Sequence, residues 1–319
     1  MDAGKDRPAN QEVSASGQIK RALVLPGGGG RGAYQVGVAK ALMIERGLTF
    51  DFAFGTSIGG LNAAMIAQGG LRRLEELWST MRAKDIFCLP SAPQIGRLFL
   101  GHHLGILDTS PMEELLRREA NLAALKASST KVGLCTTDLC SLQTSLITTD
   151  DIMSTNELID VLMATSALPM AFPPRHLHGS GLWVDGGLVR NTPMDAALSM
   201  GADEIYMVLL HPAKINICPT NLFEVLSRCL DIVLDASAKK EIHSAELYNR
   251  LIDEGNQESR GRKKVKIKVF QPRRAVNTTL LEIDPQRSRK LISQGYEEAL
   301  EQLSDESLTE SEEEEARAC

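Results

Sequence analysis

A serine between glycines is the feature of this 319-residue sequence that most clearly suggests chemistry. Ser57 is the centre of Gly55-Thr56-Ser57-Ile58-Gly59, a G-x-S-x-G pentapeptide that follows the strand-like run at 50–54. A tight reversal from strand to helix leaves no room for Cβ atoms beside the serine, so glycines at 55 and 59 are what such a turn requires. The pattern predicts Ser57 as a nucleophile, with Gly55 and Gly59 shaping its turn. A plain glycine turn would look similar, so the strand before it and the expected helix at 60–67 carry much of this interpretation.

A glycine-rich loop upstream of this serine could hold negative charge. The apolar run at 21–25 leads into Pro26-Gly27-Gly28-Gly29-Gly30-Arg31-Gly32, and residues 33–44 are expected to form a helix. Glycines allow successive backbone N–H groups to converge on one point, and the dipole of the following helix adds positive potential there. In an enzyme that transfers acyl groups, such a loop serves as the oxyanion hole.

The same glycines fit a second pattern, the G-x-G-x-x-G loop of dinucleotide-binding proteins. Gly27, Gly29 and Gly32 match it, and Asp51 follows at about the spacing of a ribose-binding acid. In that class the acid lies at the carboxyl end of the second strand, whereas Asp51 lies at the beginning of its strand. A nicotinamide-binding protein is therefore an alternative that the position of Asp51 disfavours.

An aspartate later in the chain could act as a base. The apolar residues 182–184 lead to Asp185, which is followed by Gly186 and Gly187. Asp-Gly pairs are common turn formers, so this segment alone would more often be structural than catalytic. A serine hydroxyl needs a base to accept its proton, however, and a carboxylate whose pKa is raised by burial can serve directly.

The remaining elements alternate as a doubly wound α/β sheet requires. Expected strands lie at 131–137, 143–148 and 204–210, and expected helices lie at 112–119, 158–165, 194–200, 222–234 and 289–303.

The three glycine-bearing segments, in this order, resemble the patatin-like phospholipase family. Residues 26–32 are similar to its G-G-G-x-R-G block, residues 55–59 to its nucleophile elbow, and residues 185–187 to its D-G-G/A block. Residues 165–174 are also similar to a stretch that the family carries before its aspartate. The resemblance covers about residues 20–210.

The resemblance implies an α/β fold with three layers, α/β/α, around a central and mostly parallel sheet. It implies a serine lipid acyl hydrolase, of phospholipase A, lysophospholipase or esterase type, that works through an acyl-serine intermediate without a metal or other cofactor. Ser57 would be the nucleophile and Asp185 the general base. The implied oxyanion hole consists of Gly28, Gly29, Gly30 and Arg31, with Arg31 holding the loop. Ile58 departs from the family, which usually has a small residue there, and we expect it to contact substrate.

Two other functions remain open. The α/β-hydrolase fold also uses G-x-S-x-G and adds a histidine to form a Ser/Asp/His triad. His211, at the end of the apolar run 205–210, is the candidate for that role. The second alternative is a catalytically silent, lipid-binding regulatory protein on the same fold.

Length and composition predict one large domain between two polar ends. Residues 1–18 are polar and lack an apolar signal sequence, so we expect a disordered leader. Residues 19–303 are expected to form the patatin-like catalytic domain, and the glutamate-rich residues 304–319 a disordered acidic tail. No apolar run is long enough to span a bilayer, and six scattered cysteines favour a reducing cytoplasm.

Two segments could contact lipid. Residues 85–107 are apolar and interrupted by glycine, as in a flap, and residues 260–274 form a basic cluster that could meet anionic headgroups. The plainer interpretation of residues 85–107 is a connector packed on the core. The plainer interpretation of the basic cluster is an edge strand in which Lys266 and Lys268 alternate with apolar residues. A net charge of −6 disfavours a nucleic-acid partner. We therefore expect a cytoplasmic protein with a lipid or membrane-interface substrate, and peripheral membrane contact stays open.

Overall fold

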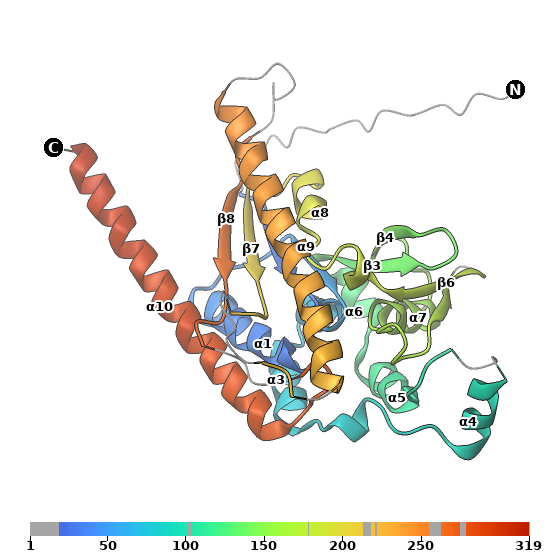
Figure 1. Cartoon of the computed structure of the whole chain (residues 1–319). Coiled ribbons are helices and arrows are strands. Elements are labelled where there is room, and N and C mark those ends of the chain that lie inside the picture. Colours follow the sequence, from blue (N-terminus) through green and yellow to red (C-terminus); the bar gives the residue numbers. More distant parts are fainter. Residues whose placement is uncertain are drawn as a thin grey trace, which may run out of the picture.

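The computed structural model describes residues 19–100, 104–177, 179–212, 218–220, 222–254, 263–274 and 279–318. In this part of the chain one sheet forms the middle layer, and helices cover both of its faces (Figure 1). The predicted three-layer α/β/α architecture is therefore confirmed. The expected leader lies outside the described residues.

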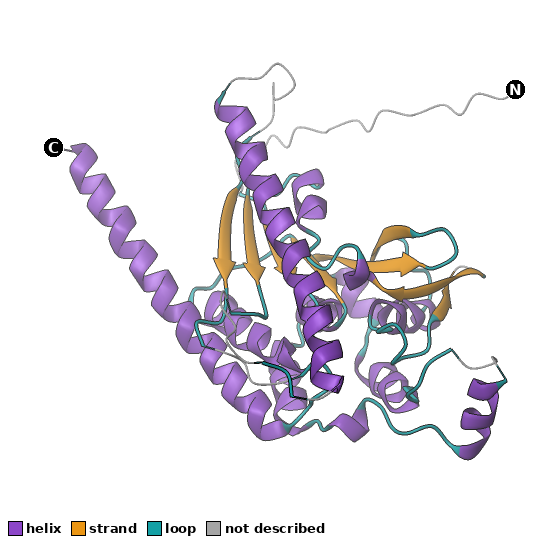
Figure 2. Ribbon diagram, in the orientation of Figure 1, coloured by secondary structure: helices purple, strands orange, loops and turns teal. Residues whose placement is uncertain are grey.

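The sheet has eight strands within the described residues and is mostly parallel (Figure 2). Five strands lie side by side and parallel, in the order β3 (Lys131–Asp138), β2 (Phe52–Thr56), β1 (Arg21–Leu25), β7 (Glu204–Val208) and β8 (Lys266–Phe270). The antiparallel strands are β4 (Gln143–Thr148) and β6 (Ser180–Asp185), which pair with β3, and β5 (Arg175–Leu177), which pairs with β6.

Successive residues of the central strands point into two different cores. Leu23 and Leu25 of β1 belong to the larger core, whereas Ala22 and Val24 belong to the smaller core on the opposite face. All four side chains are fully buried. Burial on both faces is what gives a central parallel strand its continuous apolar sequence.

The larger core is covered by helices whose apolar faces pack on that side of the sheet. These helices are α1 (Ala33–Lys40, continued by a π-helical turn over Ala41–Glu45), α2 (Ile58–Ala67), α3 (Leu71–Thr80), α5 (Ser110–Glu119), α6 (Leu122–Ala127), α7 (Thr155–Thr165) and α10 (Pro285–Ala318). The smaller core is covered by α8 (Met194–Ser199) and by α9 (Leu222–Asp253). Helix α4 (Ala92–Phe99) stands apart from the main body (Figure 1).

Two helices are longer than the sequence indicates. The expected helix at 222–234 continues to Asp253, and α10 runs from Pro285 to Ala318. The expectation of a disordered acidic tail from 304 is therefore wrong for residues 304–318, which are helical. Glutamate and alanine are good helix formers, so a helix already started on the core can continue through such a segment.

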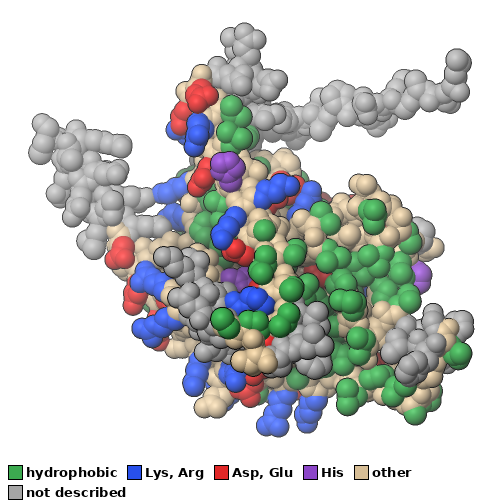
Figure 3. Space-filling view, in the orientation of Figure 1, with side chains coloured by type: hydrophobic (Ala, Val, Ile, Leu, Met, Phe, Trp, Pro, Cys, Tyr) green, Lys and Arg blue, Asp and Glu red, His purple; other side chains and the backbone are tan. Residues whose placement is uncertain are grey.

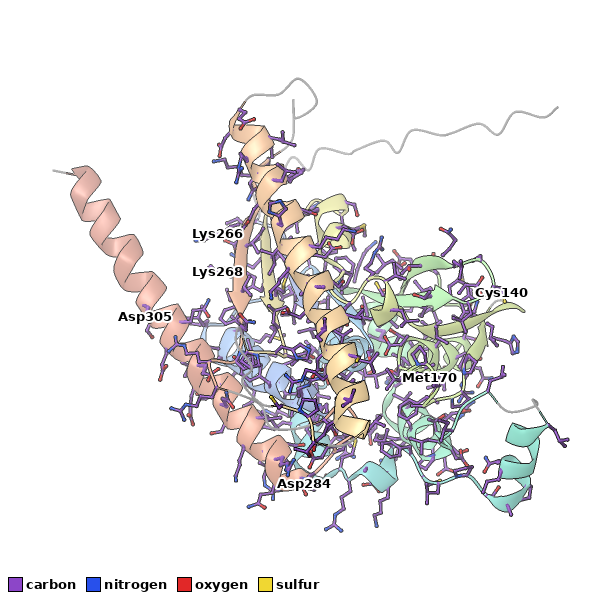
Figure 4. The ribbon with its side chains drawn as sticks, viewed as in Figure 1. Cys140, Met170, Lys266, Lys268, Asp284 and Asp305 are labelled. Carbon is purple, nitrogen blue, oxygen red and sulfur yellow. The ribbon has the colours of Figure 1, made fainter. Side chains whose placement is uncertain are left out.

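Only part of the basic cluster at 260–274 lies within the residues that the structure describes. Arg260 and Arg262 lie outside the described residues, whereas Lys266 and Lys268 lie on β8 (Figure 4). This strand pairs with β7 and is the last in the sheet order, so the edge-strand interpretation is confirmed. No helix in the described ranges is long and apolar enough to cross a membrane.

Candidate active site

Ser57 occupies the turn between β2 and α2 in a strained conformation. Its φ is 56° and its ψ is −133°, in a part of conformational space that few residues other than glycine adopt. Its N–H donates to Oγ1 of Thr165 at 3.1 Å, and Thr165 in turn donates to the carbonyl of Cys135 at 2.6 Å. The turn is thus fastened to α7 and β3, and the strain at Ser57 is held by its surroundings.

The glycines on either side of Ser57 are needed because backbone atoms approach them closely. A Cβ atom on Gly59 would lie 1.9 Å from the carbonyl oxygen of Leu25, and one on Gly55 would lie 2.4 Å from the carbonyl oxygen of Gly59. Neither position has space for a side chain, so β2 and α2 can meet at this angle only with glycine at both places.

The register of β3 brings Asp185 to Ser57. Strand β2 ends with Thr56 opposite Cys135, and β6 ends with Asp185 opposite Thr136, the next residue of β3. Because β4 pairs with the other edge of β3 over residues 133–138, β2 and β6 must share one edge and meet end to end. The residues that follow β2 and end β6 therefore lie face to face.

Asp185 is buried and lines the same pocket as the serine. The side chain of Ser57 interacts with its carboxylate, and the N–H of Gly187, in a short 3₁₀ turn (Gly186–Leu188), donates to Oδ1 at 2.8 Å. Burial raises the pKa of Asp185 to about 6, although its interactions with Ser57 and Gly187 act in the opposite direction. Near pH 7 this group can therefore accept a proton more readily than an exposed aspartate.

Two glycines of the loop between β1 and α1 have free amides and line the pocket that contains the serine. Gly28 and Gly29 line the same pocket as Ser57, and their N–H groups have no hydrogen-bond partner among the described residues. Gly30 was expected to share this role, but its N–H donates to the carbonyl of Leu280 at 2.9 Å. The inclusion of Gly30 among the oxyanion donors is therefore wrong, because the segment before α10 already occupies its amide.

Arg31 holds the loop from behind and does not line the pocket with Ser57. It is 3% exposed, and its Nε donates to the carbonyl of Gly28 at 3.1 Å. Its two terminal nitrogens contact Nδ1 of His211 at 2.7 Å and Oδ1 of Asp231 at 2.6 Å. The expectation that Arg31 holds the loop thus has a geometric basis, and Asp231 is a partner that sequence analysis missed.

The position of His211 argues against a Ser/Asp/His triad. A guanidinium can only donate, so Nδ1 of His211 must accept from Arg31 and the ring proton must lie on Nε2. Burial, together with the charge of Arg31, lowers the pKa of His211 to about 4. Nδ1 of the ring contacts Arg31, whereas the side chain of Ser57 interacts with Asp185.

A buried amide network, also missed by sequence analysis, supports the glycine loop. Gln35 donates to the carbonyl of Pro26 at 2.8 Å, and Asn62 donates to Oε1 of Gln35 at 2.8 Å. Asn62 also bonds to Gly32 at 3.0 Å and accepts from Trp78 at 3.1 Å. The sequence did contain a signal for this network, namely Asn62 within an alanine-rich helix, because asparagine is disfavoured in helix interiors.

An apolar pocket opens beside Ser57. Its empty space, including the open mouth, is about 810 Å³. The apolar wall includes residues from several parts of the chain: Ile58 and Leu61 of α2; Ile86, Phe87 and Met112; Leu168, Pro169 and Phe172; Leu230, Val233 and Leu234 of α9; and Leu280, Leu281 and Ile283 before α10. Ile58 lines the pocket, as expected of a residue that contacts substrate. The described residues contain no cluster of three or more acidic, histidine or cysteine side chains that could hold a metal ion.

Comparison with known proteins shows the family of this chain. A cGAMP-activated phospholipase of Escherichia coli (strain TW11681) is 30% identical over 199 residues, which are 54% of this chain and 53% of that protein. The chain thus spans about half the length of this curated relative. Among solved structures, VipD from Legionella pneumophila aligns over 90% of this chain and 67% of its own, with a TM-score of 0.47 and 13% identity. The model of the patatin-like phospholipase family matches residues 23–198, and the chain belongs to that family.

Proposed function

We propose that this protein is a serine lipid acyl hydrolase that works through a Ser57/Asp185 dyad. The observation that carries the proposal is the meeting of these two side chains at the wall of one apolar pocket, beside the free amides of Gly28 and Gly29. A nucleophile, a base with raised pKa and two oxyanion donors are the groups that ester hydrolysis needs. The apolar wall suits an acyl chain.

The reaction proceeds in two steps. Oγ of Ser57 attacks the ester carbonyl carbon while its proton moves to Asp185, and the carbonyl oxygen becomes an oxyanion facing the N–H groups of Gly28 and Gly29. Collapse of this intermediate breaks the ester bond, and Asp185 gives its proton to the departing alcohol. Water then attacks the acyl-serine while its proton moves to Asp185; as the ester bond to Oγ breaks, Asp185 returns this proton to Ser57, which releases the fatty acid and restores the free serine. Each oxyanion donor of this kind contributes about 3 kcal/mol to such a step.

The apolar side chains around the mouth of the pocket favour a substrate at a lipid surface. Leu188 and Val233 line the pocket and are also 39% and 45% exposed. Ile232, on the same turn of α9, is 62% exposed, and Met170, next to the lining residue Pro169, is 70% exposed. Hydrophobic side chains gather beside α9 on the face shown in Figure 3, and Figure 4 labels Met170 on the same face. This apolar mouth would contact the surface of a membrane peripherally.

Hydrolysis assays test the dyad. Wild type, Ser57→Ala and Asp185→Asn are assayed on a short-chain ester and on phospholipid vesicles, and Ser57 is probed with a serine-reactive fluorophosphonate. We expect both variants to lose hydrolysis of both substrates. A loss in His211→Ala as large as the loss in Asp185→Asn would favour the triad. A folded wild type that neither hydrolyses nor reacts with the probe would favour a catalytically silent lipid-binding protein.

A separate assay tests the membrane contact. Burying an exposed isoleucine contributes about 1.5–3 kcal/mol, so Ile232→Asp should weaken binding to phospholipid vesicles by roughly tenfold or more. Hydrolysis of vesicles should fall more than hydrolysis of a soluble ester. Leu142→Asp, at a 77% exposed site in the turn between β3 and β4, is the matched control. Equal vesicle binding by the two variants would contradict the contact.

A further inference from the structure

A buried ion pair joins helix α9 to the glycine-rich loop. Arg31 and Asp231 meet at 2.6 Å, and their side chains are 3% and 12% exposed. A guanidinium buried in this way is costly unless a carboxylate and hydrogen-bond acceptors surround it. Asp231 is its only carboxylate partner within hydrogen-bond distance among the described residues, and Gly28 and His211 supply the neutral acceptors.

The contact of Arg31 with Gly28 fixes the direction of an oxyanion donor. The carbonyl of Gly28 and the N–H of Gly29 belong to one planar trans peptide group, so they point in opposite directions. Nε of Arg31 binds this carbonyl at 3.1 Å from behind the loop. The N–H of Gly29 is thereby turned toward the pocket that also contains Ser57.

Asp231 lies on the turn of α9 that also forms the pocket wall. Leu230, Val233 and Leu234 line the pocket on either side of it in sequence. The helical turn that would contact an acyl chain therefore also holds the arginine that aims the oxyanion donor. Helix α9 lies beyond residues 23–198, the part of the chain that matches the family model.

We propose that Asp231 is a positioning residue, which acts through Arg31 to aim the N–H of Gly29 at the oxyanion. The proposal rests on the proposed function, since it assigns a role within the same site. Without the carboxylate, Arg31 has no charged partner, and the Gly28 carbonyl would lose the support of the Arg31 side chain and keep only the backbone N–H of Arg31 at 3.3 Å. The loss would be felt where charge develops on the substrate, and so in kcat rather than in substrate binding.

The test compares Asp231→Asn with Asp235→Asn. Asp235 lies one turn further along α9 and pairs with Lys239 at 2.6 Å, so it supplies the same chemical change on the same helix. On a soluble short-chain ester we expect Asp231→Asn to lower kcat by roughly 10- to 100-fold with KM within about twofold, since removal of a whole donor lowers kcat by about 100- to 1,000-fold. Asp235→Asn should retain the wild-type kcat.

Two further measurements separate positioning from folding. Asp231→Glu keeps the charge and should recover part of the lost kcat, which a simple packing defect would not do. The double variant Arg31→Gln with Asp231→Asn should be little worse than Arg31→Gln alone, because both changes act through one contact. Circular dichroism and thermal unfolding show whether each variant is folded, and an unfolded Asp231→Asn leaves Asp231→Glu against wild type as the deciding comparison.

The outcomes are distinguishable. If wild type neither hydrolyses esters nor reacts with a fluorophosphonate, the proposed function fails. If wild type is active and folded Asp231→Asn keeps its kcat within twofold, or changes KM alone, only the role of Asp231 fails. A fall of equal size in Asp235→Asn, or a complete lack of recovery in folded Asp231→Glu, would also overturn that role.

Discussion

Asp185 should lower the stability of this protein at neutral pH. Burial raises its pKa from the ordinary 3.8 to about 6. Each pKa unit corresponds to about 1.36 kcal/mol, so holding this carboxylate ionised in the folded state costs about 3 kcal/mol. That is a large part of the 5–15 kcal/mol that typically separates folded from unfolded proteins. Asp185→Asn removes the cost, because a neutral amide carries no charge and its oxygen can still accept from the N–H of Gly187 while its NH2 group can donate to the hydroxyl of Ser57.

The sign of the pH dependence follows from proton binding. The folded state binds the proton of Asp185 more tightly than the unfolded chain, because its pKa is higher in the folded state. The contribution of Asp185 is therefore most favourable below about pH 4, declines between about pH 4 and 6, and stays at its lowest value above pH 6. The gain in unfolding free energy from Asp185→Asn should be less than about 1 kcal/mol at pH 4 and about 3 kcal/mol at pH 7.5.

Urea unfolding of wild type and Asp185→Asn at both pH values measures this difference. Asp150→Asn is the matched control, because Asp150 pairs with Lys131 at an exposed site where its side chain is 66% accessible. A surface pair of this kind contributes about 0–1 kcal/mol, so the control should change little at either pH. The reasoning would be refuted by an Asp185→Asn variant that is no more stable than wild type at pH 7.5, or equally stabilised at both pH values.

Three further results are expected. The value of kcat/KM should fall as pH drops below about 6, because protonated Asp185 cannot accept the serine proton; a profile measured from pH 4.5 to 8 checks this, and a flat profile would contradict it. Gly59→Ala should give no active folded enzyme, because its Cβ would lie 1.9 Å from a carbonyl oxygen, whereas Gly96→Ala, with no atom within 4 Å, should behave as wild type in solubility and esterase assays. Asn62→Leu should cost about 1–3 kcal/mol in urea unfolding, because it leaves the buried Trp78 N–H and its other partners unpaired, and a smaller loss would mean that the amide network adds little.

The sequence is sufficient to predict the parts of the fold that repeat a strong pattern. Apolar runs bounded by glycine or proline indicated β1, β2 and β6, and these three strands carry the loop, the serine and the aspartate. Family resemblance then indicated Ser57 and Asp185, which the structure brings together at one pocket. The sequence could not show why these two residues meet, because their meeting depends on which residues of β3 lie opposite the ends of β2 and β6.

The errors arose where a distant segment decides the environment. Gly30 looked equivalent to Gly28 and Gly29, and only the approach of Leu280 from the other end of the chain distinguishes its amide. The acidic residues after 304 looked too polar to be ordered, but their helix continues from residues such as Ala299 and Leu303 that are buried in the core. For Gly30, the deciding contact is about 250 residues away in the sequence. For the acidic residues, the packed turns that precede them in α10 outweigh the local composition.

The division of the pocket between two parts of the chain limits what relatives can indicate about substrate. Ser57, Asp185 and the glycine loop all fall within residues 23–198, the part that matches the family. The wall formed by Leu230, Val233 and Leu234, and by residues 280–283, falls outside it. The catalytic residues can therefore be shared with relatives while part of the pocket wall, from α9 and the segment before α10, comes from residues beyond that match. Because Asp231 ties that same α9 turn to Arg31, a change in this wall would alter the oxyanion loop as well as the fit of the acyl chain.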